Sequence, residues 1–282
     1  MRAIRLKNDI FLPILGQGTW NMGENPDTRK DEIEALRCGI EHGMNLIDTA
    51  EMYGEGKAEE LIGEAIRPFR REQLFIVSKV YPWHADRENI FISCEKSLRR
   101  LGTDYLDMYL LHWHEDVPYE ETVSCMHELM ADGMIRSWGV SNLDTADMEE
   151  VAAVGGGDCM VDQVLYNIGA RGIEYDLLPW LKEHDMKAMA YCPLAHDASQ
   201  RESIISHPVI RRIALAHHVS PCTVMLGFVL QNPDVCTIVK AGSVKHVKEN
   251  LKALDLKFTH TEWLKLNEAF PAPDHKMPLA TE

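Results

Sequence analysis

The stretch LIDTAEMYG, residues 46–54, joins a short apolar run to a carboxylate and then to a tyrosine. Leu46 and Ile47 are typical of a buried β-strand, but the run ends on the charged Asp48. Tyr53 comes five residues later and precedes Gly54, which is typical of a turn. A charge at the end of a buried strand, with a phenol just beyond it, indicates a site built where the strand ends.

On both sides of this stretch, short apolar runs alternate with longer helical patterns. The predicted strands are 14–17, 45–48, 74–80, 106–111, 136–140, 160–165, 187–191 and 235–239. The predicted helices are 28–42, 58–67, 86–100, 119–131, 144–153, 173–184, 207–231 in two pieces, and 244–253. Eight strand–helix units predict a single (β/α)8 TIM barrel domain over residues 1–282. We also expect an N-terminal β-hairpin at 2–12 and a C-terminal extra helix at 261–270 before an irregular tail.

The alternative α/β fold is a doubly wound sheet, which usually carries a GxGxxG motif after its first strand. The corresponding turn here is GQGTWNMG, residues 16–23, whose third glycine is not at the required spacing. The sequence therefore favours the barrel. In a barrel, the active site forms at the C-terminal ends of the strands.

Composition limits the partners of the protein. Lys and Arg number 29 against 44 Asp and Glu, a net charge of −15, which argues against nucleic acid or an anionic membrane. The seven cysteines are scattered and form no CxxC motif, which is typical of reduced thiols in a cytoplasmic protein. No apolar run reaches about 18 residues, so no membrane span is predicted. We expect a cytoplasmic monomer.

Three predicted strands that follow one another end near Asp48, Lys79 and His112. Neighbouring strands lie about 4.8 Å apart, so these side chains are expected to converge, with Tyr53 looping over them. A carboxylate keeps a nearby lysine protonated, and a buried cation makes a phenol a stronger acid. Tyr53 could then protonate a developing alkoxide while a neutral His112 holds the carbonyl oxygen. We expect no metal in this site.

These four groups supply no electrons, so carbonyl reduction would need a hydride donor such as a nicotinamide cofactor. Other strand ends offer partners for one. Ser141, Asn142 and Gln163 can hydrogen-bond a carboxamide, and Tyr191 offers a flat ring for stacking. The segment VKAGSVKHVKEN, residues 239–250, places positive charge at the start of a helix, where barrel enzymes often bind phosphate.

Several longer motifs occur in a fixed order: LGQGTW, NLIDTAEMYGEGKAEELIG, VSKVYPW, SLRRLGTDYLDMYLLHW, GMIRSWGVSN, QVLYN, AYCPLA and VKAGSVKHVKEN. With these motifs the chain resembles the aldo-keto reductase family over nearly its whole length. The resemblance implies a catalytic tetrad of Asp48, Tyr53, Lys79 and His112. Tyr53 would be the general acid, Lys79 paired with Asp48 would tune it, and His112 would orient the carbonyl.

The resemblance also implies a cofactor site. The residues that would bind the carboxamide, the nicotinamide ring, the pyrophosphate and the adenine are Ser141, Asn142, Gln163, Tyr191, Leu194, Glu249 and Asn250. Two positions depart from the family pattern: Cys192 stands where Ser is frequent, and His246 where an Arg often reads the 2′-phosphate. We expect NADPH because Lys240, Ser243 and Lys245 can surround a phosphate, with NADH as an alternative cofactor.

Two other interpretations stay open. His112 and His114 in HWHE have the spacing of metal ligands, which would suit a metal-dependent hydrolase. Ser141, Asn142 and Lys240 at the later strand ends are poor ligands for a divalent ion, which weighs against this function. The other interpretation is a non-catalytic, cofactor-binding regulatory subunit, because an intact site shows competence rather than use.

Aromatic residues follow the predicted strands that carry the tetrad. Trp20, Trp83 and Trp113, with Tyr81 close by, are expected to line the mouth of the site, which suits a small, weakly polar carbonyl compound. The connections at 113–118 and 194–206 are predicted to be short loops that leave the site open. Resemblance to bacterial reductases of methylglyoxal and related 2-oxoaldehydes implies a substrate of that class.

Overall fold

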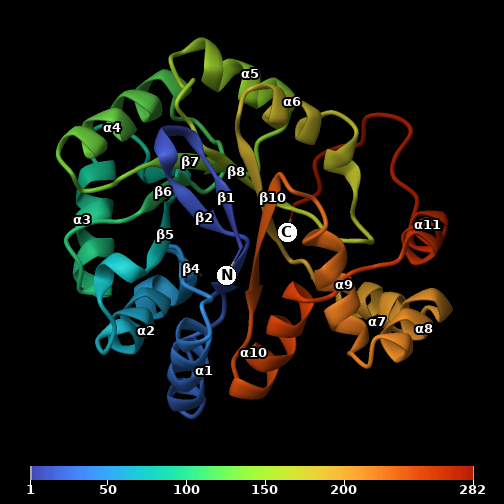
Figure 1. The fold of residues 1–282 in the computed structure, drawn as a ribbon. Coiled ribbons are helices and arrows are strands. Elements are labelled where there is room, and N and C mark those ends of the chain that lie inside the picture. Colours follow the sequence, from blue (N-terminus) through green and yellow to red (C-terminus); the bar gives the residue numbers. More distant parts are fainter. Residues whose placement is uncertain (1, 282) are drawn as a thin grey trace.

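Eight parallel strands close into a barrel in the computed structural model, which describes residues 2–281 (Figure 1). The strands are β3 (Leu15–Gly18), β4 (Leu46–Asp48), β5 (Phe75–Val80), β6 (Met108–Leu111), β7 (Trp138–Ser141), β8 (Val161–Leu165), β9 (Lys187–Tyr191) and β10 (Val235–Lys240). They pair in sequence order, and β10 closes the barrel by pairing with β3. The predicted barrel is confirmed.

Helices surround the barrel (Figure 1). They are α1 (Arg29–Glu41), α2 (Lys57–Ile66), α3 (Ile90–Leu101), α4 (Tyr119–Ala131), α5 (Thr145–Ala153), α6 (Leu177–Glu183), α7 (Ala198–Ser206), α8 (Pro208–Ala216), α9 (Pro221–Val229), α10 (Val244–Leu251) and α11 (His260–Ala269). Short 3-10 helices are η1 (Lys7–Asp9), η2 (Tyr53–Gly56), η3 (Arg71–Gln73), η4 (Pro82–His84), η5 (Gly172–Glu174) and η6 (Lys252–Leu254). None of the helices within residues 2–281 is long and apolar enough to cross a bilayer.

Helix α7 corrects the prediction of a loop over 194–206. Its sequence, ASQRESIIS, buries only Ile204, so it lacks the apolar periodicity that identifies a helix. The helix begins instead with a cap, because the Asp197 side chain accepts a hydrogen bond from the Gln200 amide at 2.7 Å. The connection after β9 is therefore ordered by a helix.

The hairpin of β1 (Ala3–Arg5) and β2 (Phe11–Pro13) turns at η1, as predicted, and crosses one end of the barrel (Figure 1). Phe11 shares a shallow depression with Asn45 and Phe75, which lie where strands begin. The hairpin thus covers the N-terminal ends of the strands. The opposite end, where the strands finish, is left for the site.

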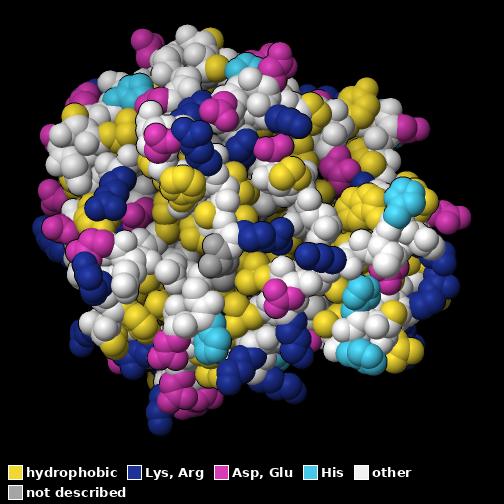
Figure 2. All heavy atoms as spheres, viewed as in Figure 1, with side chains coloured by type: hydrophobic (Ala, Val, Ile, Leu, Met, Phe, Trp, Pro, Cys, Tyr) yellow, Lys and Arg dark blue, Asp and Glu magenta, His cyan; other side chains and the backbone are white. Residues whose placement is uncertain are grey.

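Apolar side chains fill the barrel interior below that end. Leu46, Val77, Leu110 and Met189 are fully buried within one hydrophobic cluster. A buried polar contact fixes β5 against α2, because the Ser78 hydroxyl donates to Glu59 Oε1 at 2.6 Å. On the outer surface, acidic and basic side chains are interspersed over the face in Figure 2.

Candidate active site

Lys79 lies at the centre of the site, fully buried near the end of β5. Its Nζ donates hydrogen bonds to Asp48 Oδ2 at 2.9 Å, to the Thr49 carbonyl at 2.8 Å and to the Tyr53 hydroxyl at 3.1 Å. Three acceptors match the three hydrogens of an ammonium group. The structure therefore brings together the carboxylate, the lysine and the phenol that the strand ends predicted.

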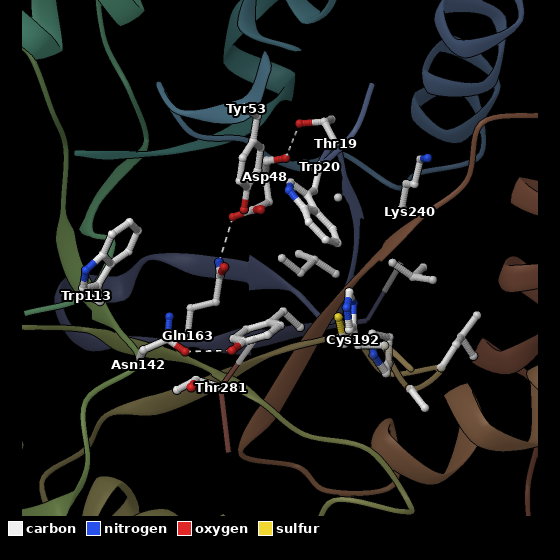
Figure 3. A pocket seen from close by; sticks show the side chains of 18 of the residues that line it. Thr19, Trp20, Asp48, Tyr53, Trp113, Asn142, Gln163, Cys192, Lys240 and Thr281 are labelled. Carbon is white, nitrogen blue, oxygen red and sulfur yellow. Dashed lines mark hydrogen bonds between the residues drawn. The ribbon is translucent and has the colours of Figure 1, made fainter. Parts of the chain in front are cut away.

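Tyr53 reaches this position through an unusual turn. Gly54, Glu55 and Gly56 follow it with φ of 57°, 56° and 91°, all in the left-handed region. The φ of Gly56 favours glycine, and a Cβ there would lie 2.6 Å from the Arg100 side chain, which would have to move. This turn sends the chain back into α2 and leaves the phenol facing the cavity in Figure 3.

Burial opposes the charges of the Asp48–Lys79 pair. Desolvation is the largest influence on both: it raises the pKa of Asp48 and lowers the pKa of Lys79, against their mutual attraction. The lysine is thus less firmly protonated than pairing alone predicted. The hydrogen bonds to Asp48, Thr49 and Tyr53 favour the ammonium form of Lys79. The bond to Tyr53 places this positive charge beside the phenol oxygen.

His112 follows β6 and lies beside Tyr53, with ring centroids 5.8 Å apart in an edge-to-face arrangement. Burial and the charge of Lys79 hold the pKa of His112 well below its usual value. The imidazole is therefore neutral at physiological pH. Its Nδ1 is buried and has no partner among residues 2–281, which favours a tautomer with the proton on Nε2.

The predicted carboxamide ligands form a network with the tetrad. The Gln163 amide nitrogen donates to Asp48 Oδ1 at 2.7 Å (Figure 3). The Ser141 hydroxyl donates to the backbone carbonyl of Gln163 at 2.8 Å. The Tyr191 hydroxyl donates to Asn142 Oδ1 at 2.7 Å. Gln163 thus supports Asp48, a contact that sequence reasoning did not identify.

A cavity of about 680 Å³ opens above these groups. The predicted residues among its lining are Trp20, Asp48, Tyr53, Trp113, Asn142, Gln163, Tyr191, Leu194 and Lys240. Tyr81 and Trp83, predicted to line the mouth, do not: their rings stack at 5.1 Å and pack against Trp113. They contact the cavity wall through Trp113, which does line the cavity.

The residues predicted around α10 also lie outside the cavity lining, except Lys240. Ser243 caps α10, accepting a hydrogen bond from the His246 amide. Glu249 accepts hydrogen bonds from Lys252, Thr223 and Ser220, and these bonds, that from Lys252 most of all, lower its pKa to about 2. Lys245 and His246 are exposed, whereas Asn250 is buried.

Sequence reasoning missed several lining residues. Cys192, which the sequence identifies as a departure from the family pattern and not as a site residue, lines the cavity, and so does Arg201 from the predicted loop 194–206. Thr281 in the C-terminal tail also lines it (Figure 3). The tail is fixed near the mouth by Lys276, whose Nζ pairs with Asp144 at 3.5 Å and Asp176 at 3.3 Å. No local pattern in the tail sequence indicates this return.

The donor groups fit a nicotinamide dinucleotide better than a metal. Lys240 and Arg201 bring positive charge to the cavity, which suits the phosphates of such a molecule, and Tyr191 brings an aromatic ring. By contrast, His112 is buried beside Tyr53, while His114 is exposed and stacks on Tyr119 at 3.9 Å. The two imidazoles do not share one ligand position. The fold and site define a (β/α)8-barrel protein with a phenol and a buried ion pair at the floor of an open cavity.

Comparison with known proteins agrees with this description of the fold. The aldo/keto reductase family model matches residues 14–270. The methylglyoxal reductase YeaE of Escherichia coli is 49% identical over 279 residues, covering 99% of this chain and 98% of that protein. A Klebsiella pneumoniae aldo-keto reductase, solved with NADPH, has a TM-score of 0.96 at 46% identity, covering 100% of this chain and 99% of the other. The chain belongs to the aldo/keto reductase family and is an oxidoreductase.

Proposed function

We propose that the protein reduces small aldehydes and ketones to alcohols, with Tyr53 as the general acid and NADPH as the hydride donor. The observation that carries the proposal is the 3.1 Å hydrogen bond from Lys79 Nζ to the Tyr53 hydroxyl at the cavity floor. Lys79 also forms a buried ion pair with Asp48. A phenol beside a buried cation can give up its proton because the phenolate is stabilised there.

The side chains divide the work as follows. His112 Nε2–H donates to the substrate oxygen and orients the carbonyl. When bound, the nicotinamide supplies the hydride that goes to the carbonyl carbon. Tyr53 gives its proton to the oxygen as negative charge develops there. Lys79 stabilises the phenolate that remains, and Asp48, held by Gln163, keeps Lys79 in place.

NADPH is supported by Lys240 in the cavity and by the NADPH complex of the similar Klebsiella protein. NADH is retained as an alternative because His246 replaces a frequent arginine and another relative is an NADH-specific methylglyoxal reductase of Escherichia coli at 28% identity. Small 2-oxoaldehydes such as methylglyoxal are the proposed substrates. They fit walls made by Trp20 and Trp113, and the relative at 49% identity is a methylglyoxal reductase.

The proposal includes a single barrel domain over residues 1–282 that works as a cytoplasmic monomer without nucleic-acid or membrane partners. The net charge of −15 and the seven free cysteines support it. Size-exclusion chromatography with light scattering, at several protein concentrations, checks the oligomeric state. A stable dimer mass would contradict this part.

Tyr53→Phe tests the proposal. Turnover of methylglyoxal is expected to fall by about 10²–10⁴-fold because the proton donor is lost, while the Kd for NADPH stays near that of the wild type. Tyr175→Phe is the matched control, since that tyrosine is exposed and outside the cavity. Turnover near the wild-type rate in Tyr53→Phe would disprove the general-acid role. NADPH binding without turnover in the wild type would favour the regulatory subunit instead.

A further inference from the structure

Two carboxylates lie at one wall of the cavity, and the proposed chemistry uses neither of them. Asp147, in the first turn of α5, is among the residues that line the cavity. Trp113 also lines it, and the indole Nε1 of Trp113 donates to Glu115 Oε1 at 3.0 Å. With His114, another lining residue, these side chains form what we call the acidic wall (Trp113, His114, Glu115 and Asp147).

Contacts place Asp147 beside the chain that follows β6. The Tyr119 hydroxyl donates to Asp147 Oδ1 at 3.0 Å, and the His114 ring stacks on the Tyr119 ring with centroids 3.9 Å apart. In Figure 3, Trp113 and Lys240 lie at opposite sides of the cavity. The acidic wall therefore lies across the cavity from the cation of Lys240.

The two carboxylates of the acidic wall have only uncharged hydrogen-bond partners. Asp147 Oδ2 accepts a hydrogen bond from the backbone amide of Asp144 at 2.9 Å, and Glu115 accepts one from the indole. Neither forms an ion pair with any residue from 2 to 281. Lys276, the lysine that reaches the start of α5, pairs with Asp144 and Asp176 instead. The N-terminal end of α5 offers only about half a positive charge, so the wall keeps a net negative charge.

The positive side chains of the cavity do not compensate this charge. Lys79 is paired with Asp48. In the proposed function, Lys240 and Arg201 lie against the phosphates of the cofactor. A substrate that enters the cavity after the cofactor therefore meets the charge of the acidic wall. The ring of Trp113 in the same wall attracts a cation through its face as well.

We propose that the acidic wall selects substrates by charge, so that the protein reduces uncharged and cationic aldehydes and rejects those that carry a carboxylate. The inference rests on the proposed function and leaves the reaction at Tyr53 unchanged. A carboxylate on the substrate loses water in the cavity and meets repulsion instead of a partner. A quaternary ammonium group gains attraction from both carboxylates and from the aromatic face. Asp147 is half-buried and should act more strongly than the exposed Glu115, because solvent screens an exposed charge.

The test compares aldehydes that differ in charge and little in shape. Succinic semialdehyde is anionic and its methyl ester is uncharged, whereas trimethylammonioacetaldehyde is cationic and its tert-butyl analogue is uncharged. We measure kcat/KM for each with saturating NADPH and form the ratio of the charged to the uncharged substrate for one protein at a time. The change of this ratio from wild type to variant is independent of overall activity, of the folded fraction and of the intrinsic reactivity of each aldehyde.

Asp147→Asn is expected to raise the anionic ratio about 3- to 10-fold and to lower the cationic ratio by a similar factor, as for one charge a short distance away in a solvated site. Glu115→Gln keeps an acceptor for the Trp113 indole and is expected to change both ratios about twofold. Added salt should move both ratios of the wild type in the same directions. The matched control is Glu183→Gln at the end of α6, an exposed carboxylate outside the cavity lining.

The results separate this inference from the proposed function. Wild-type ratios in the Glu115→Gln/Asp147→Asn double variant would overturn charge selection, and so would changes no larger than those in Glu183→Gln. A wild type that reduces succinic semialdehyde as well as its ester would also overturn it. If the wild type reduces none of the four aldehydes, the proposed function fails instead. Circular dichroism checks folding, and Glu115→Gln carries the test alone if Asp147→Asn does not fold.

Discussion

At the tetrad end of the cavity, hydrogen bonds join Asp48, Lys79 and Tyr53, and His112 lies against the Tyr53 ring. At the end expected to bind phosphate (the phosphate end: Leu194, Arg201 and Lys240), the side chains form no hydrogen bond with any residue from 2 to 281. Lys79 donates to three acceptors in a fully buried setting. Neither Arg201 nor Lys240 has an ion pair with any residue from 2 to 281.

This difference shows how the site divides its tasks. Catalytic groups gain from being preorganised, because no energy is then spent on arranging them during the reaction. Groups that bind an anionic cofactor gain from having no partner in the protein, because an internal ion pair would first have to break. The variants below are expected to affect chemistry at one end and cofactor affinity at the other.

Lys79→Met should have the largest effect. Loss of the cation beside Tyr53 is expected to lower kcat by about 10³-fold. It also leaves Asp48 buried without its charged partner, so the free energy of unfolding should fall by about 3–5 kcal/mol. Stopped-flow kinetics and urea unfolding measure the two losses.

The double variant Asp48→Asn/Lys79→Met separates these effects. It removes both charges and should recover part of the stability but none of the turnover. Recovery of turnover together with stability would mean that Lys79 is only structural.

Lys240→Ala should have a smaller effect, confined to the phosphate end. Its Kd for NADPH is expected to rise about tenfold while its Kd for NADH changes little, because only NADPH carries the 2′-phosphate. Lys248→Ala on α10 is the control for loss of one exposed positive charge. Equal losses for the two cofactors would place the 2′-phosphate elsewhere.

His246→Arg should sharpen the preference for NADPH by about threefold, since an arginine can bind a phosphate with two hydrogen bonds. The ratio of the two Kd values, measured by fluorescence titration, checks this. An unchanged ratio would show that position 246 does not reach the ribose.

The pH profile of kcat/KM should lack the change that a catalytic histidine with its usual pKa would cause near pH 6.5, about the pKa of an unperturbed histidine. Because burial lowers the pKa of His112, it stays neutral as pH falls through about 6.5, and kcat/KM should show no acid limb there. Below that pH the folded state binds fewer protons than the unfolded state. The free energy of unfolding should therefore decrease as the pH is lowered, and it should decrease less in His112→Gln. A limb near pH 6.5 that vanishes in His112→Gln would contradict the neutral imidazole.

The sequence predicted the tetrad end well because strand register places it. Once eight strand–helix units are recognised, Asp48 and Lys79 must lie on adjacent strands. The turn at Tyr53 could also be expected, since Gly54 and Gly56 supply the left-handed backbone.

The remaining parts depend on packing that no local pattern encodes. Helix α7 lacks apolar periodicity, so the sequence predicts a loop at Arg201 instead of a helix. The return of Thr281 to the cavity depends on an ion pair of Lys276 with Asp144, far away in sequence. The hydrogen bonds by which Glu249 ties α10 to the start of α9 are likewise not indicated by the local sequence.

The central claim is that hydride passes to a carbonyl carbon above Tyr53. NADPH carrying deuterium at the transferable position of C4, incubated with methylglyoxal and the purified protein, tests it by mass spectrometry of the product. We expect one deuterium on the carbon that bears the new hydroxyl, and none with Tyr53→Phe over the same time. An alcohol without deuterium, or no alcohol despite tight binding of NADPH, would contradict it.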